Sequence, residues 1–258
     1  MPELPDVEGQ RRLFRRHAAG KRVLSLSAID EILRNSSPQA SGRAIKGHRF
    51  ENPERHGKWL LCPTDEPILI FHFGMTGELV WASREQHEHS HDRLVLHFGD
   101  GELRYRAMRK LGGVWLARNR DEIPEVTGPL GPDALRVSRR DFIQRVGDRR
   151  GSIKAALMDQ RPIAGLGNLT VDESLWRARI APGRSAAELD DKELIRLHGR
   201  MRRVLTDSVK EGRVPPKRSW LTGVRDTKSP HCPRCGTPLD RSRIAGRTTY
   251  WCPVCQPA

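Results

Sequence analysis

The stretch Cys232-Pro-Arg-Cys235, followed by Cys252-Pro-Val-Cys255, decides how this chain of 258 residues ends. A Cys-x2-Cys turn presents two thiolates to one tetrahedral Zn²⁺, and a second pair completes a closed four-thiolate site with no open position for chemistry. The residues between the pairs read as two short strands with a turn at Ala245-Gly246, so the metal would pin a β-hairpin. We therefore expect one structural zinc ion, held by Cys232, Cys235, Cys252 and Cys255.

Two disulfides in an exported protein are the alternative explanation for these cysteines. The opening Met1-Pro-Glu-Leu-Pro-Asp6 has neither the basic n-region nor the apolar h-region of a signal peptide, so zinc is favoured. Arg241, Arg243 and Arg247 would then project from a rigid hairpin. Such a platform indicates a nucleic-acid-binding element.

Bulk charge also indicates an anionic partner. Forty-six Lys and Arg against thirty-two Asp and Glu give a net charge of +14, and the stretch from Arg213 to the end holds nine basic and two acidic residues. Such an excess favours phosphate backbones or anionic membranes. No run approaches the roughly 18 apolar residues that a spanning helix needs. Nucleic acid is therefore the expected partner, and no membrane is expected.

The first half of the chain reads as β after an opening helix over Val7–Ala19, which would end at Gly20. Gly99-Asp-Gly101 supplies a hairpin turn. Short strands at this spacing predict a β-sandwich or barrel. The expected strands are Val23–Ile29, Ala44–Phe50, Lys58–Cys62, Ile68–Phe73, Arg93–Phe98, Glu102–Arg106 and Val114–Ala117.

Apolar residues recur with helical spacing after the Gly128–Pro132 stretch, where prolines and glycines interrupt both the strand pattern before it and the helical pattern after it. Helices are expected over Arg139–Val146, Ile153–Gln160, Leu169–Arg177 and Lys192–Glu211. The turn before the third carries Gly165, Gly167 and Asn168. Its glycines would admit a ligand, and the following helix start would attract a phosphate, with Asn168 as cap. An ordinary helix–turn–helix connection is the alternative.

Several separated motifs together resemble the bacterial formamidopyrimidine-DNA glycosylase/endonuclease VIII family. They are Met1–Glu8, Gly57–Leu60, His72–Gly77, Ala164–Asn168, the two Cys-x2-Cys pairs and Gly246–Thr249. The resemblance runs from the first residue to the last cysteine and implies a multi-domain α+β fold with DNA bound in a cleft between the halves. The expected domains are a catalytic β-sandwich with a flanking helix over 1–127, a helix-two-turn-helix domain over 128–222 and a zinc finger over 223–258.

The activity that this resemblance implies is that of a bifunctional DNA glycosylase and AP lyase of base excision repair. Removal of Met1 would expose the secondary amine of Pro2, which would attack C1′ of a damaged nucleotide, expel the base and hold the sugar as an iminium. Strand cleavage by β- and δ-elimination would follow. Glu3 would move protons at the sugar, and Lys58 would reach the lesion's phosphate or the leaving base. Arg247 completes the implied catalytic set.

The resemblance also assigns DNA contacts. Asn168 matches a phosphate-gripping asparagine and Arg247 the zinc-finger arginine. Arg149 and Lys154 lie where the family has a phosphate contact, and His91 matches a DNA-contacting histidine, although His87 and His89 offer other registers.

A glycosylase must flip its target nucleotide out of the duplex and fill the gap. The family uses a Met, an Arg and an aromatic wedge. Met75 and Arg109 match the first two, and Leu111 stands where an aromatic is usual. A leucine can wedge between bases but lacks aromatic stacking.

Two departures from the family pattern affect which lesion we expect to be cleaved. Asp6 replaces the usual Glu, and the stretch from Arg213 to His231 is short where 8-oxoguanine-excising members carry a longer loop. We therefore expect abasic and formamidopyrimidine DNA to be cleaved ahead of 8-oxoguanine, while the preferred lesion stays open.

Two other functions are weighed against the enzyme: a non-catalytic protein that binds lesions or abasic sites on the same scaffold, and a zinc-finger transcription factor. The presence of Pro2, Glu3 and Lys58 favours the enzyme. We further expect a monomer in the bacterial cytoplasm, associated with the nucleoid. Cys62 is expected to be a buried apolar residue.

Overall fold

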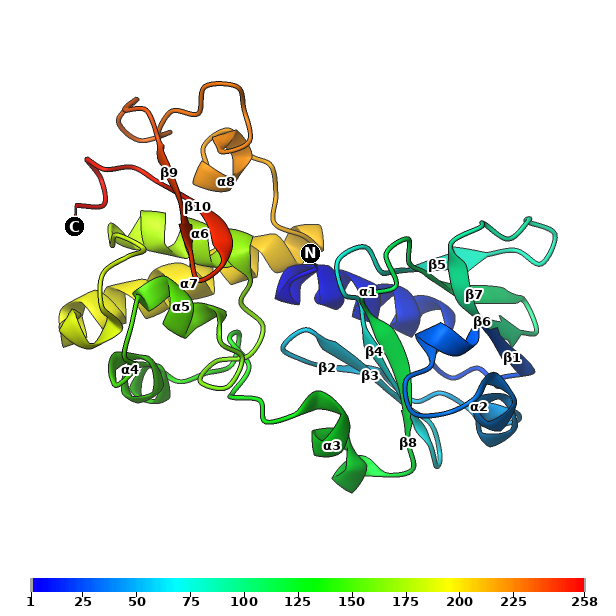
Figure 1. Ribbon diagram of the computed structural model, residues 1–258. Coiled ribbons are helices and arrows are strands. Elements are labelled where there is room, and N and C mark those ends of the chain that lie inside the picture. The colour runs from blue at the N-terminus through cyan, green and yellow to red at the C-terminus, as the bar shows by residue number, and fades with distance from the viewer. Residues whose placement is uncertain (1, 258) are drawn as a thin grey trace. The chain divides into compact units, whose positions relative to one another are not determined.

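The computed structural model describes residues 2–257, which form two compact units (Figure 1). The N-terminal unit comprises Pro2 and Asp6–Gly128. The C-terminal unit comprises Glu3–Pro5 and residues 129–257. Apart from the short segment Glu3–Pro5, the chain passes between units at Gly128–Pro129, inside the interruption expected from the sequence. The finer division at residue 222 stays a prediction.

The N-terminal unit is built on two four-stranded sheets, in which all neighbouring strands are antiparallel. One sheet has the order β1 (Ser25–Ala28), β6 (Asp92–Phe98), β7 (Gly101–Arg106) and β5 (Glu78–Ala82). The other has the order β2 (Glu54–His56), β3 (Trp59–Pro63), β4 (Ile68–His72) and β8 (Gly113–Ala117).

One hydrophobic core joins the two sheets, which confirms the predicted sandwich. Leu60 and Phe71 of one sheet belong to the same buried cluster as Leu96 and Leu103 of the other. Phe14 of helix α1 (Leu4–His17) lies in this cluster, with its ring edge-on to Phe50 at 4.9 Å. Cys62 is buried in the cluster, as expected.

Short helical segments complete the N-terminal unit. They are η1 (Asp30–Ile32), α2 (Pro38–Ile45), η2 (Arg120–Glu122) and α3 (Ile123–Thr127). The chain leaves α1 through Gly20 at φ 77°, which confirms the expected left-handed end.

The predicted strand Ala44–Phe50 is wrong. Ala44 and Ile45 end α2, because Ser37 caps this helix by accepting from the Ala40 N–H and Pro38 follows at its first turn. β2 and β5 were not expected. β2 has only three residues, whereas β5 carries the apolar run Leu79–Ala82 and was missed.

The C-terminal unit contains four main helices: α4 (Arg139–Gly147), α5 (Ile153–Met158), α6 (Asn168–Ala178) and α7 (Asp191–Glu211). The short η3 (Ala186–Glu188) and α8 (Leu221–Val224) lie in connections. Helix α6 contacts α5, α7, α8 and strand β10, so it is the central element of this unit. The four predicted helices are confirmed to within three residues at each end.

Strands β9 (Asp240–Ile244) and β10 (Arg247–Trp251) form the predicted hairpin. Its turn residues Ala245 and Gly246 have φ of 51° and 70°, as a tight two-residue hairpin turn requires. The predicted α+β class, with a sandwich, a helical part and a C-terminal hairpin, is confirmed.

Candidate functional site

The four cysteines of the hairpin are arranged for a metal ion. Their sulfurs lie within 4.8 Å of one another, with Cys235 Sγ at 3.5 Å from both Cys252 Sγ and Cys255 Sγ. Four sulfurs at about 2.3 Å from a tetrahedral zinc are about 3.8 Å apart, whereas a disulfide bond is about 2.05 Å long. The site therefore fits one structural zinc, and the disulfide alternative is wrong.

Helix α6 supports this metal site. Trp176 Nε1 donates to Cys232 Sγ at 3.3 Å, and Trp176, Leu221, Cys232 and Cys252 share one buried cluster. Such an outer hydrogen bond orients a thiolate ligand. Gln256 Nε2 donates to the Ile180 carbonyl at 2.8 Å and fixes the chain after the last cysteine.

Glu3 caps helix α6. Its Oε1 accepts from the Leu169 N–H at 2.7 Å, and its Oε2 accepts from the Thr170 N–H at 3.0 Å and the Thr170 hydroxyl at 2.6 Å. Two of these donors are backbone N–H groups that a helix leaves without an internal partner, and the positive end of the helix dipole favours a carboxylate. The anion at this helix start is thus the protein's own Glu3, which corrects the expectation of a phosphate there.

Gly167 explains one glycine of the turn before α6. A Cβ at this position would lie 2.3 Å from Glu3 Cδ, far inside van der Waals contact. Only glycine therefore admits the carboxylate. The close approach that the sequence suggests at this glycine is real, but the group that approaches is Glu3.

Asn168 does not cap α6, since it is the first helical residue and Gly167 occupies the cap position. Its side chain reaches the zinc hairpin instead, where Nδ2 donates to the Thr248 carbonyl at 3.1 Å. Arg247, an exposed residue at the start of β10, precedes that carbonyl by one residue. The structure thus brings together Asn168 and the strand that carries Arg247.

The two basic residues expected near phosphate differ in placement. Arg149 is partly exposed, and its guanidinium pairs with Asp159 at 2.5 Å. Lys154 is fully buried, with its ammonium 2.6 Å from Asp172 Oδ1 and 2.7 Å from Thr249 Oγ1. The prediction that Lys154 contacts phosphate is wrong, because its charge is already paired inside the protein.

In the N-terminal unit, Lys58 follows Gly57 in the tight turn between β2 and β3, where Gly57 has φ 56°. The Lys58 side chain is largely buried, at 9% exposure. Burial and the Lys58 charge lower the pKa of His72 to about 4, which keeps that imidazole neutral near pH 7. Pro2 belongs to the same unit and is half-buried.

Met75, Arg109 and Leu111 lie on neighbouring loops of this unit. Arg109 donates from its backbone to Thr76 Oγ1 at 3.1 Å, and its guanidinium lies 3.8 Å from Met75 Sδ. A Cβ at Gly74 would lie 2.6 Å from the Leu111 carbonyl carbon, so the loops pack backbone to backbone. Met75 is 38% exposed and Leu111 59% exposed.

Met108 belongs to the same exposed group, at 54% exposure, and sequence reasoning missed it. An exposed large apolar side chain marks a contact surface, but whether such a side chain is exposed is known only from the structure. Arg34 was missed as well. Its guanidinium donates to the carbonyls of Lys110 and Gly112, and Lys110 adopts φ 48°, so Arg34 fixes a strained turn next to Leu111.

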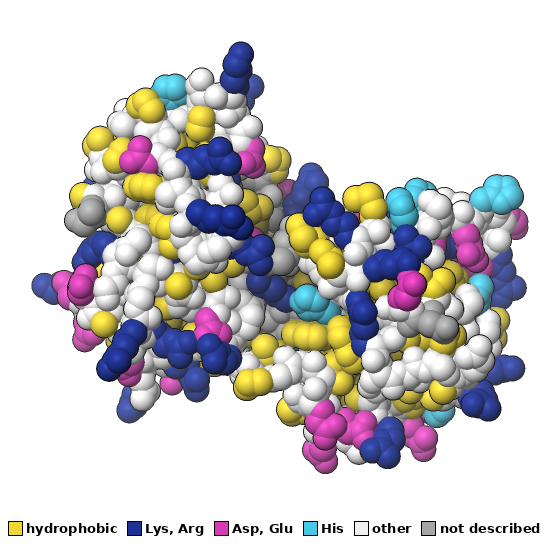
Figure 2. All heavy atoms as spheres, viewed as in Figure 1, with side chains coloured by type: hydrophobic (Ala, Val, Ile, Leu, Met, Phe, Trp, Pro, Cys, Tyr) yellow, Lys and Arg dark blue, Asp and Glu magenta, His cyan; other side chains and the backbone are white. Residues whose placement is uncertain are grey.

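His91 lies after β5, in a loop that also holds His87 and His89; Figure 2 shows His side chains on this part of the surface. The His91 ring is half-buried, 5.1 Å from the His89 ring, and the other two side chains are exposed. Buried Arg104 donates to the His87 carbonyl at 2.9 Å and anchors the loop.

The positive charge is concentrated in one unit. Residues 129–258 hold twenty-six Lys and Arg against fourteen Asp and Glu, whereas residues 1–128 hold twenty against eighteen. Figure 2 shows basic side chains at several places on the viewed face of the C-terminal unit. This unit therefore carries most of the attraction to a polyanion.

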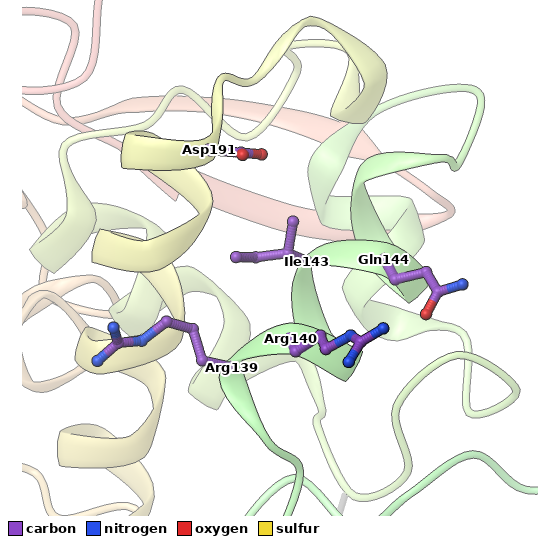
Figure 3. A pocket seen from close by; sticks show the side chains of 5 residues that line it. All are labelled: Arg139, Arg140, Ile143, Gln144 and Asp191. Carbon is purple, nitrogen blue, oxygen red and sulfur yellow. The ribbon is translucent and has the colours of Figure 1, made fainter.

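A cavity of about 630 Å³ between α4 and α7 contains none of the predicted site residues. Arg139, Arg140, Ile143, Gln144 and Asp191 line it, and in Figure 3 the two arginine side chains point in different directions while Ile143 lies between them. It offers no cluster of catalytic groups.

Comparison with known proteins identifies the family. Three family models match: the formamidopyrimidine-DNA glycosylase N-terminal domain at residues 1–114, its H2TH domain at 130–216, and a zinc finger found in FPG and IleRS at 231–258. Formamidopyrimidine-DNA glycosylase of Symbiobacterium thermophilum is 36% identical over 274 residues, which cover 100% of this chain and 90% of the relative. The Geobacillus kaustophilus protein of the same name is 37% identical, with 99% and 100% covered.

The chain belongs to the formamidopyrimidine-DNA glycosylase family. The predicted family, enzyme class and structural zinc are confirmed. This glycosylase also resembles a Lactococcus lactis FPG mutant solved with Fapy-dG containing DNA, at TM-score 0.91 and 28% identity with 100% of both chains covered. A complex between Lactococcus lactis Fpg and abasic-site DNA gives TM-score 0.89 at the same identity and coverage. Within residues 2–257, no helix of the glycosylase has the length and apolar character that crossing a membrane requires.

Proposed function

We propose that this glycosylase is bifunctional: it excises oxidised or ring-opened bases from duplex DNA through the amine of Pro2 and then cleaves the strand at the abasic site. The observation that carries the proposal is the Glu3 carboxylate, held by three donors at the start of α6 directly after Pro2 in the chain. A fixed carboxylate next to a terminal secondary amine is suited to moving protons while that amine reacts.

The chemistry begins once Met1, which lies outside the described residues, has been removed. The Pro2 nitrogen adds to C1′ of the damaged nucleotide, and the C1′–N bond breaks as the base leaves with its electron pair and takes up a proton. The sugar ring opens to an iminium on Pro2. Loss of a C2′ proton then expels the 3′ phosphate (β-elimination), and a second loss expels the 5′ phosphate (δ-elimination). Glu3 takes the proton that the Pro2 amine loses on addition, passes it to the ring oxygen as the ring opens, and then accepts the C2′ proton; the proton for the departing base comes from solvent. Water finally hydrolyses the iminium and frees the Pro2 amine.

Lys58 serves this reaction as a cation for the lesion's phosphate or the leaving base. Its position in a tight turn, its burial and its effect on His72 support a fixed rather than freely moving ammonium. Arg247 binds phosphate from the zinc hairpin.

Phosphate contacts are proposed for Asn168, Arg149 and His91 in addition. Asn168 uses one amide hydrogen for Thr248 and has a second for a phosphate oxygen. Met75, Arg109 and Leu111 enter the duplex where the nucleotide is flipped out, and we add Met108 because it is exposed beside them.

The lesion preference follows from the segment between α7 and the zinc finger. In Arg213–His231, Trp220, Leu221 and Arg225 are buried, and Thr222 is bound through its N–H to Glu173 at 3.1 Å. Few residues are left to enclose a base, so abasic and formamidopyrimidine DNA should be cleaved ahead of 8-oxoguanine opposite cytosine. Single-turnover rates on matched duplexes test this order, and equal rates for formamidopyrimidine and 8-oxoguanine would contradict it.

The domains are 1–127, 128–222 and 223–258, and the protein acts as a monomer in the bacterial cytoplasm near the nucleoid. A non-catalytic protein that binds lesions or abasic sites is the alternative function.

Borohydride trapping on abasic-site DNA separates enzyme from binder, because only an amine that forms an iminium becomes covalently attached. We expect a trapped complex with the processed protein, and none with Pro2→Gly or with an N-terminal extension, while DNA binding persists in both. Undiminished trapping by Pro2→Gly would remove Pro2 as the nucleophile. Binding without any trapping would establish the non-catalytic alternative.

A further inference from the structure

Four buried side chains from separate elements of the C-terminal unit meet in one ionic cluster, formed by Lys154, Asp172, Arg225 and Thr249. Asp172 of α6 accepts from the Lys154 ammonium of α5 at 2.6 Å and from the Arg225 guanidinium after α8 at 2.6 Å. The same ammonium donates to the Thr249 hydroxyl of β10 at 2.7 Å. One carboxylate thus ties together α5, α6, the α8 segment and the zinc hairpin.

The charges of this cluster depend on each other. Burial raises the pKa of Asp172 and lowers the pKa of Lys154, so each charged form is maintained by its oppositely charged neighbour. The negative charge of Glu3 also favours the charged form of Lys154 and acts to raise its pKa. Removing one member of such a cluster leaves a buried, uncompensated charge, which is strongly destabilising.

The cluster holds three consecutive residues of β10, directly after Arg247. The Thr248 carbonyl accepts from Arg225 at 3.2 Å and from Asn168 at 3.1 Å. Thr249 is held by Lys154, and the Tyr250 backbone is hydrogen-bonded to Asp172. The strand next to Arg247 is therefore held by α5, α6 and the segment after α8 through these bonds.

Zinc alone does not fix this end of the strand. The metal site follows β10 at Cys252, about 16 Å along an extended strand from Arg247. Trp176 and Gln256 secure the chain near the cysteines. The ionic cluster is the attachment that lies next to Arg247.

We propose that Asp172 is a positioning residue for DNA binding: through Lys154 and Arg225 it holds β10 so that Arg247 and Asn168 bind phosphate together. The proposal rests on the proposed function, in which these two residues contact the DNA backbone. Asp172 itself touches no DNA. A purely structural cluster is the competing explanation.

The first variant replaces all three charged members at once, as Lys154→Met, Asp172→Leu and Arg225→Met, because apolar replacement of a whole buried ion cluster can preserve the fold. Zinc content and thermal unfolding are measured on the full zinc-loaded chain, together with affinity for abasic-analogue duplex over a series of salt concentrations. We expect zinc to be retained, affinity to fall about tenfold, as the loss of one charge-assisted contact implies, and the salt slope to fall by about one.

Arg247→Ala is then combined with this triple variant. If Asp172 acts by positioning Arg247, adding Arg247→Ala costs little further affinity, although alone it costs about tenfold. Wild-type affinity in the triple variant, or a full additional cost of Arg247→Ala, would overturn the proposal.

A second pair keeps the test decisive if the triple variant does not fold. Thr249→Val removes the hydroxyl that joins the hairpin to Lys154 while all charges remain, and Thr249→Ser keeps that hydroxyl. We expect Thr249→Val to raise KM, with an unchanged single-turnover rate at saturating DNA, and Thr249→Ser to restore wild-type KM. Equal KM for both variants and wild type would overturn the proposal. Borohydride trapping at saturating DNA checks the proposed function separately, since its absence in the wild type would refute that function regardless of KM.

Discussion

Gly167 makes room for the carboxylate of Glu3, since a Cβ at position 167 would lie 2.3 Å from Glu3 Cδ. The two residues are 164 positions apart in the sequence, yet each requires the other. The carboxyl group of Glu3 occupies the space that a side chain at position 167 would need, which explains why the motif has a glycine there.

Gly167→Ala should displace Glu3 from the start of α6. We expect excision to fall as severely as in a Glu3 variant, with a loss of about 1–3 kcal/mol in unfolding free energy from the forced contact. Gly199→Ala on α7 is the matched control, because its Cβ would meet nothing within 4 Å. That control should be stabilised by up to about 1 kcal/mol. Urea unfolding and single-turnover excision measure both, and full excision by Gly167→Ala would contradict the steric argument.

Glu3→Gln should abolish base excision while retaining part of the lyase activity on pre-formed abasic sites, where no glycosidic bond must break. The amide would turn a donor toward an N–H or hydroxyl of the α6 cap, at a cost of about 1–3 kcal/mol. Thr170→Val serves as the control, because it removes one hydrogen bond to Glu3 but keeps the carboxylate. The rates of base excision on intact lesions and of strand cleavage at pre-formed abasic sites, measured in parallel, test this expectation. Equal loss of both activities in folded Glu3→Gln would reject this division.

Zinc removal should weaken DNA binding severely while the N-terminal sandwich stays folded, because structural zinc contributes folding energy locally. Cys252→Ser should act like a chelator. Cys62→Ala is the control, since Cys62 lies in the sandwich core and should change stability without changing zinc content. Metal analysis, circular dichroism and binding isotherms on the same samples provide the comparison. Unaltered affinity after complete zinc loss would exclude a role of the hairpin in binding.

The exposed apolar group, formed by Met75, Met108 and Leu111, should fill the duplex when the nucleotide is flipped out. Leu111→Ala and Met108→Ala should slow excision of a base paired in the duplex, and affect a lesion opposite a gap much less, since no stack has to be filled there. Leu111→Phe should strengthen binding to abasic DNA by restoring aromatic stacking. Ile195→Ala, an exposed apolar residue of α7, is the control. Equal effects on paired and gapped substrates would argue against a wedge.

Acid should destabilise the N-terminal unit through His72. Its pKa is lowered from 6.5 to about 4 by burial and the Lys58 charge. The unfolded chain therefore binds a proton that the folded chain rejects, so stability falls as pH drops from about 6.5 to about 4 and is unaffected by this group above that window. The unfolding free energy falls by at most about 3 kcal/mol across this window, and solvent screening of the partly exposed imidazole reduces that value. Denaturant unfolding of the wild type and His72→Gln across this window tests it, and identical pH profiles would contradict the assignment.

Local patterns predicted most of the fold. The zinc hairpin, with its turn at Ala245-Gly246, and the long helix α7 followed from the spacing of residues that lie within a few positions of each other. The strand expected at Ala44–Phe50 failed because Ala44 and Ile45 belong to α2, whose start is fixed by the Ser37 cap, and this cap lies outside the stretch that was read as a strand.

The site was harder to predict wherever its partners are distant in sequence. Lys154 looked like a surface cation within a basic stretch, and only the fold reveals Asp172 and Thr249 around its ammonium. The cap of α6 likewise comes from Glu3, more than 160 residues away, so a local rule assigned it to Asn168. Contacts of this kind arise from tertiary packing and leave no periodic signal.

Met75 and Met108 give the exposed apolar group a chemical vulnerability. Both residues are exposed, and oxidation of a methionine to the sulfoxide makes its side chain polar and chiral. The oxidants that damage bases attack these sulfurs as well. Oxidative stress would therefore impair the filling of the duplex when lesions are most frequent, until sulfoxide reductases restore the thioethers. Leu111 has no sulfur and keeps its shape through such an episode.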